Sequence, residues 1–192
     1  MNISQRRHWL KTALAGVAAV GLGRLPLRAQ EASKKFSEDF GPDWQVQKEY
    51  TLEVAQAMPA DKYSFKPSEE MRSFGALMTH IAQSQYSFAS GLRGEPMPAA
   101  AAAPKEPTKE NLVAFLTASF DYAAEGIARL ADAQAEESVS LFGGRLTTTR
   151  GKLCHHMRNH TTHHRAYSLP YLRMNGVAPP NYRFAGRRPS PV

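Results

Sequence analysis

The sequence of 192 residues predicts an all-α fold, a four-helix bundle with one long crossover loop. Three observations predict it. Apolar residues recur with the i, i+3, i+4, i+7 spacing of amphipathic helices in four separate stretches. Clusters of proline and glycine separate these stretches. A strand pattern occurs only in the region around Gly143-Gly144, where we expect a turn or a small hairpin before the last helix.

Residues 1–30 have the features of a secretory signal peptide. Arg6-Arg7, followed by Trp9, Leu10 and Lys11, resembles the start of a twin-arginine signal. The apolar run at 13–22 is about half as long as the ~20 residues that a membrane-spanning helix needs. We therefore expect an exported, periplasmic protein without a stable membrane span, cleaved near Ala29. The competing interpretation is an ordinary basic N-terminus.

The first two helices are predicted at residues 43–58 and 69–92. Pro59 ends the first helix, and Ser68 is a suitable N-cap for the second, with Glu69 and Glu70 favourable in its first turn. An apolar stripe predicts that one face of the second helix is buried; it consists of Phe74, Leu77, Met78, Ile81 and Tyr86.

A Pro/Ala-rich loop at 94–107 forms the expected crossover to a third helix, which Thr108 caps. The fourth helix is predicted at 148–174 and ends at Asn175-Gly176, a common C-terminal signal. The bundle thus occupies residues 31–182, and residues 183–192 form a basic, proline-containing tail.

The formal net charge of +7 lies at the two ends of the chain. Residues 1–30 carry five basic side chains and no acidic one, and the tail adds Arg183, Arg187 and Arg188. Residues 31–182 are nearly neutral, so the bundle lacks the basic surface that binds nucleic acid. Nucleic acid is excluded as the main partner.

Cys154 is the only cysteine, which rules out an internal disulfide. A lone cysteine in an apolar pattern is more often a small buried residue than a nucleophile. We therefore assign Cys154 to the core.

Five of the seven histidines lie in residues 154–165. Residues four apart share one face of a helix, so His156, His160 and His164 are expected on one side, while His155 and His163 turn away. His80 lies on the apolar face of the second helix. If the two helices face each other, His80, His160 and His164 form a site for one divalent metal ion with an open position, and His156 is either a fourth ligand or a supporting group. A core histidine is the competing interpretation of His80.

Other metal sites find no support in the sequence. There is no CxxCH for covalent haem, no Glu-x-x-His for a di-iron bundle and no HExxH for a zincin-type protease.

Two stretches resemble DinB-like domains. They are FKPSEEMRSFG at 65–75 with LMTHIA at 77–82, and NHTTHHR at 159–165 with PYLRMNG at 170–176. The resemblance implies a four-helix bundle with a zinc or nickel ion on His80, His160 and His164. It also implies a range of activities that includes transfer of low-molecular-weight thiols, isomerisation and hydrolysis. Family members often have His-His-Arg-Gly-Gln where this chain has Ala166 and Tyr167 after Arg165.

Three functional hypotheses follow. The first is a metal-dependent enzyme of the thiol-transferase or hydrolase type, in which Arg158 or Arg165 orients an anionic small-molecule substrate. The second is a non-catalytic metal-binding or structural module, and the third is an interaction bundle without metal. A homodimer through one bundle face is compatible with the sequence, although no exposed stripe indicates which face.

Overall fold

The computed structural model describes residues 33–183. The predicted signal peptide and all of the predicted tail after Arg183 lie outside the described residues. No described helix is long and apolar enough to cross a membrane.

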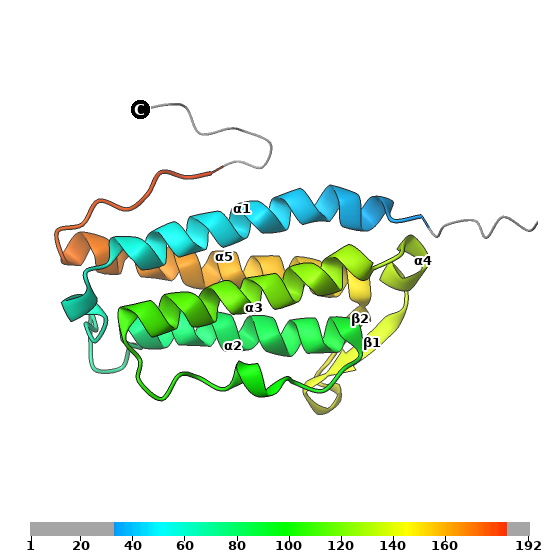
Figure 1. The fold of residues 1–192 in the computed structure, drawn as a ribbon, viewed down its shortest axis with the longest axis horizontal. Coiled ribbons are helices and arrows are strands. Elements are labelled where there is room, and N and C mark those ends of the chain that lie inside the picture. Colours follow the sequence, from blue (N-terminus) through cyan, green and yellow to red (C-terminus); the bar gives the residue numbers. More distant parts are fainter. Residues whose placement is uncertain (1–32, 184–192) are drawn as a thin grey trace, which may run out of the picture. The chain divides into compact units, whose positions relative to one another are not determined.

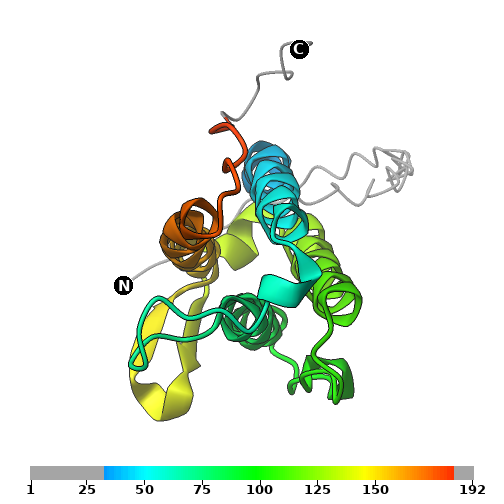
Figure 2. The ribbon, with the colours of Figure 1, turned by 90° about the vertical axis from the view of Figure 1, so that its left-hand side faces the viewer.

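Four long helices form the bundle, as expected from the sequence (Figure 1). They are α1 (Lys35–Ala57), α2 (Phe74–Arg93), α3 (Lys109–Arg129) and α5 (Arg150–Met174). Helices α1 and α2 each pack against α3 and α5, so α1 and α2 lie on one diagonal of the bundle (Figure 2). The crossover from α2 to α3 contains one short 3₁₀ turn, Ala99–Ala101, and the short helix α4 (Asp132–Ala135) follows α3.

The first helix begins at Lys35, eight residues before the expected start. Phe36 stacks on Phe40 with a centroid distance of 5.7 Å, and the Phe40 ring is buried. This apolar contact extends the helix through Pro42, although proline inside a helix removes one hydrogen bond.

The second helix begins later than predicted, and Ser68 is not its N-cap. Ser73 caps it instead, with its hydroxyl accepting a hydrogen bond from the Ala76 amide at 3.2 Å. The Phe74 and Gly75 amides donate to the carbonyls of Phe65 and Tyr63. Because these tertiary bonds use the N–H groups that a helix leaves unpaired, the chain before Ser73 stays a loop. The predicted Thr108 cap of α3 is confirmed, and Thr149 caps α5.

The expected hairpin is present before the last helix. Strand β1 (Ser138–Leu141) pairs antiparallel with β2 (Leu146–Thr149). A Cβ at Gly91 of α2 would lie 2.7 Å from a methyl carbon of Leu141, so the glycine permits close packing of the hairpin on α2.

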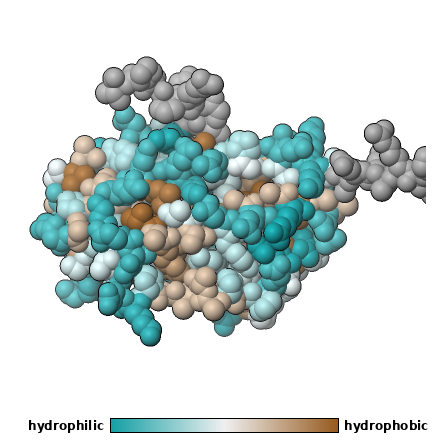
Figure 3. Space-filling view, in the orientation of Figure 1, coloured by the Kyte–Doolittle hydropathy of each residue, from teal (hydrophilic) through white to brown (hydrophobic). Residues whose placement is uncertain are grey.

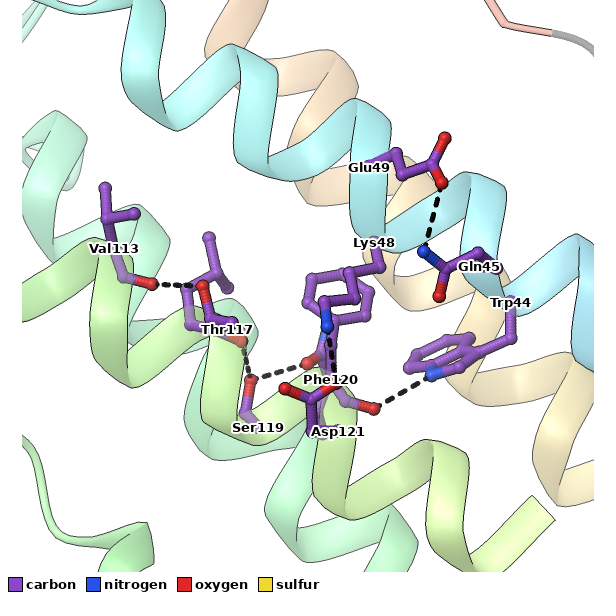
Figure 4. Close-up of polar contacts among 11 residues, drawn as sticks. Trp44, Gln45, Lys48, Glu49, Val113, Thr117, Ser119, Phe120 and Asp121 are labelled. Atoms are coloured by element: carbon purple, nitrogen blue, oxygen red, sulfur yellow. Dashed lines mark hydrogen bonds and ion pairs between the residues drawn. The ribbon is translucent and has the colours of Figure 1, made fainter. Parts of the chain in front are cut away.

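The interface between α1 and α3 combines a buried aromatic contact with polar bonds (Figure 4). The indole N–H of Trp44 donates to the Phe120 carbonyl at 3.2 Å, and the Trp44 ring packs on the Phe120 ring. Nearer the surface, Lys48 pairs with Asp121. On the face drawn in Figure 3, hydrophobic residues gather in the middle and toward the lower edge, with hydrophilic residues around them.

A polar contact inside the core joins three helices. Gln85 of α2 donates to the Thr161 hydroxyl of α5 at 3.4 Å, and the Ser119 hydroxyl of α3 lies 2.6 Å from the Gln85 carbonyl oxygen. All three side chains are fully buried. Buried polar groups favour a single arrangement when each has a partner, so this network fixes α2, α3 and α5 relative to one another.

We predict that Gln85→Ala lowers the free energy of unfolding by about 1–3 kcal/mol, because it leaves Ser119 and Thr161 buried with fewer partners. Urea denaturation at neutral pH measures the change. Gln83→Ala, at an exposed position of the same helix, is the matched control and should change stability by less than about 0.5 kcal/mol. Equal effects of the two substitutions would contradict a stabilising role of the network.

Candidate metal centre

The structure brings together the three histidines that the sequence singled out. His80 on α2 and His160 and His164 on α5 each offer one ring nitrogen, and these nitrogens lie within 4.8 Å of one another. The Nε2 atoms of His80 and His164 are 3.1 Å apart. Tetrahedral zinc with Zn–N bonds of about 2.0–2.1 Å places its nitrogen ligands about 3.3 Å from one another. The spacing therefore fits one small divalent ion.

The rotation of α5 places its two histidines toward α2. The residue after each histidine is buried: Thr161 is 0% and Arg165 is 3% exposed. The Thr161 hydroxyl bonds to the Met157 carbonyl and receives the Gln85 amide of α2. Because Thr161 and Arg165 occupy the core side of α5, His160 and His164 lie at its boundary with α2, half-buried.

Arg165 fastens the same part of α5 to α1. Its guanidinium donates to Gln47 at 2.7 Å and to Thr51 at 3.2 Å, and it lies 4.3 Å from the centre of the Tyr50 ring. These contacts fix the backbone of α5 next to His164.

The electrostatic surroundings keep the three imidazoles neutral. Burial, together with the nearby histidines, lowers the pKa of both His160 and His164 to about 4. Burial and then the charge of Arg72 lower the pKa of His80. Neutral imidazole is the form that binds a metal ion, so the site is in its ligating state at neutral pH.

Aromatic contacts orient the rings. Phe88 meets His160 edge-on with a centroid distance of 5.4 Å, and His163 meets His164 at 4.9 Å. Ligating histidines usually donate their second N–H to a fixed acceptor. Within residues 33–183, the only hydrogen bond of these three side chains is the one between His80 and His164. The hydroxyl of Thr161, the residue after His160, is engaged in the core network instead.

The remaining histidines of α5 differ in their surroundings. His156 is exposed and stands outside the three-histidine group, so the structure does not support it as a fourth ligand. His155 turns away from the three-histidine group, as expected, and its ring lies 5.2 Å from the Phe40 ring of α1. His163 was expected to turn away from the site, but it borders a cavity that His164 also lines.

That cavity has a volume of about 580 Å³ and opens beside the three-histidine group. Its walls come from the loop before α2 and from one face each of α2 and α5. They consist of Glu70, Met71, Arg72, Leu77, His163, His164, Tyr167 and Tyr171. Because this volume lies in the range of small-molecule sites, a ligand in the cavity can reach His164.

The two arginines proposed to orient a substrate do not line this cavity. Arg158 pairs with Asp43 of α1 at 3.3 Å, and Arg165 is buried against α1. Both therefore contact α1, and the structure does not support the hypothesis that Arg158 or Arg165 orients a substrate in this cavity. The cation at the site is Arg72, which sequence reasoning missed because it lies in a loop without periodic pattern.

Cys154 is fully buried, as expected for a core residue. Burial raises the pKa of its thiol to about 12, so the reactive thiolate does not form near neutral pH.

Comparison with known proteins identifies the family. A family model of the DinB superfamily matches residues 44–168. The chain belongs to the DinB superfamily. No curated protein matches the sequence.

Two solved structures show the same fold. A DinB-like protein from Bacillus cereus is 17% identical, with a TM-score of 0.67 over 76% of this chain and 97% of that chain. The DinB-like protein YjoA from Bacillus subtilis is 21% identical, with a TM-score of 0.59 over 72% of this chain and 92% of that chain. At these identities the likeness extends to the fold alone.

We predict that the metal-free protein loses stability as the pH falls from about 6.5 to about 4. The lowered histidine pKa values mean that the unfolded chain binds more protons than the folded protein in this range, so acid favours unfolding. Urea denaturation at several pH values measures the effect. The variant His160→Gln/His164→Gln should lose less stability over the same pH range. An equal loss of stability in the variant and the wild type would show that these two histidines do not cause the pH dependence.

Proposed function

We propose that this member of the DinB superfamily is a metal-dependent enzyme that holds one divalent ion, zinc or nickel, on His80, His160 and His164. The observation that carries the proposal is the convergence of three neutral imidazoles from two helices beside a cavity of about 580 Å³. Both thiol transfer and hydrolysis agree with this donor set.

A divalent ion on three protein ligands supplies Lewis-acid chemistry, because it lowers the pKa of a thiol or a water molecule at its remaining coordination position. The chain's own contribution is to fix the ligands and shape the approach. Phe88 covers the His160 side with its ring, while the cavity beside His164 stays open to a substrate.

A non-catalytic site that ties α2 to α5 is the alternative. Structural zinc sites usually have four protein ligands. Among residues 33–183, the group contains three histidines and no fourth histidine, cysteine, aspartate or glutamate. This count, together with the adjacent cavity, favours the enzyme over the structural module.

Export to the periplasm is part of the proposal and rests on the sequence of residues 1–30. Replacing Arg6 and Arg7 by lysine should keep the full chain in the cytoplasmic fraction if the twin-arginine pair directs export. Equal export of the wild type and of the variant with lysine at both positions would contradict export through the twin-arginine signal.

We predict that the untagged mature protein contains about one zinc or nickel ion per chain, since three histidines at metal-ligand spacing converge at one site. His80→Ala and His160→Ala should each lose the ion, because each removes one of three ligands. His156→Ala is the matched control: it removes an exposed histidine of the same helix and should leave the metal content unchanged. Elemental analysis of the purified proteins gives the stoichiometry.

A wild-type protein that takes up no ion after incubation with zinc and nickel would overturn the proposed site. A metal content that falls equally in His156→Ala would place the ion on the exposed histidines instead. If the ion is bound as predicted, thiol-transfer and hydrolysis substrates should be screened with the metal-loaded protein, and turnover of neither class would favour the structural alternative.

A further inference from the structure

The cavity beside His164 has features that indicate its ligand, and this inference rests on the proposed function for the role of that ligand as substrate. The cavity combines one cationic side chain with an apolar lining. Met71 and Leu77 contribute aliphatic surface, and Tyr167 and Tyr171 contribute aromatic rings. A molecule that fills this space is therefore expected to have an apolar body.

Arg72 is the cation of the cavity. Within the described part of the chain, its guanidinium forms no hydrogen bond and no ion pair with another side chain, although it is a strong donor with five N–H groups. By contrast, Arg158 and Arg165 are engaged by α1. The Arg72 side chain is thus available to a ligand.

The backbone around Arg72 is held in place. The Tyr171 hydroxyl of α5 donates to the Arg72 carbonyl at 2.9 Å, and Ser73, the next residue, caps α2. These bonds fix the base of the side chain relative to both helices that carry the histidines. A ligand bound by the Arg72 guanidinium would therefore stay in the cavity that His164 also lines.

Charge favours an anion next to Arg72. Arg72 and His164 line the same cavity, so an anion beside the guanidinium lies on the side of the three-histidine group that His164 occupies. Glu70 also lines the cavity and opposes an anion, but it is exposed and forms no ion pair with Arg72 in residues 33–183. One guanidinium beside one carboxylate suits a singly charged anion better than a dianionic phosphate.

We propose that this cavity binds a small organic carboxylate, whose carboxylate group accepts hydrogen bonds from Arg72 and whose apolar body packs on Leu77 and Tyr171. Arg72 is then a specificity-determining residue, because a planar guanidinium pairs with a carboxylate through two parallel bonds. This arrangement directs the other end of the molecule toward His164.

Phenylacetate is a suitable probe, and its affinity is measured by titration calorimetry on the metal-free and the zinc-loaded protein. Arg72→Ala should weaken binding by about tenfold or more in both forms, since it removes a charge-assisted contact. Arg173→Ala removes an exposed arginine that does not line the cavity, so it should leave the affinity unchanged. The affinity of Arg72→Lys for phenylacetate should lie between those of the wild type and Arg72→Ala.

The uncharged analogue phenylacetamide tests whether charge is recognised, and it should bind at least about tenfold more weakly than phenylacetate to the wild type alone. Glu70→Gln should leave phenylacetate binding unchanged or strengthen it, because it removes a repulsive charge. Absence of phenylacetate binding to the wild type, or equal affinities of wild type and Arg72→Ala, would overturn the inference.

Measurements on the metal-free and the zinc-loaded protein distinguish failure of this inference from failure of the proposed function. Arg72-dependent binding to a protein that takes up no metal would support the subsite and refute the metal site. If the protein binds one zinc per chain and Arg72→Ala binds phenylacetate as tightly as the wild type, the subsite alone is refuted. Phenylacetate would then contact the ion directly.

Discussion

The rotation of α5 about its own axis is the constraint on which the site depends. Thr161 and Arg165 are polar, yet both are buried in the core. Among residues 33–183, Arg165 has no carboxylate partner, and burial lowers its pKa. The amide of Gln47, the hydroxyl of Thr51 and the face of the Tyr50 ring compensate for the lost hydration. Any other rotation would break these bonds and leave a charge buried without partners. The positions of His160 and His164 on α5 are therefore fixed by residues outside the three-histidine group.

The same rotation explains which histidines converge. Successive positions four residues apart drift by about 40° around a helix, since 3.6 residues make one turn. His160 and His164 both stay at the boundary with α2, whereas His156, another four residues away, lies in solvent. The neutral rings then direct their nitrogens toward one point. A hydrogen bond can pair His80 with His164, but it leaves the His160 ring without a hydrogen-bond partner among residues 33–183. The proposed divalent ion would bind all three nitrogens together.

Periodic features of the sequence predicted most of the fold, and loops account for what it missed. The apolar stripes located four helices, Thr108 marked the start of α3, and the spacing of His80, His160 and His164 indicated the site. Ser68 was a wrong cap because the bonds that end the loop, from Phe74 and Gly75 to Phe65 and Tyr63, are tertiary. Arg158 and Arg165 were misplaced because helical spacing gives a face but not the neighbour that the face meets. Arg72 was missed because it belongs to no periodic pattern, and only the closure of the loop on Tyr171 brings it to the histidines.

The three histidines are covered by aromatic rings on the His160 side and open to a cavity on the His164 side. This difference determines from which side a small molecule can approach them. On the His160 side, the Phe88 ring lies against the His160 ring and in turn contacts Phe142 at the tip of the hairpin. Phe142 has a φ of 54°, an unfavourable conformation for a bulky side chain, and it is followed by two glycines that also have positive φ. The tight packing of Leu141 on Gly91 retains this strained turn, so the hairpin forms a fixed aromatic wall. On the His164 side, the walls are the loop with Arg72 and the last turns of α5, and the space between them is open. For the proposed function, this difference predicts that a substrate reaches the histidines from the N-terminal end of α2, where it meets the charge of Arg72 before it meets His164.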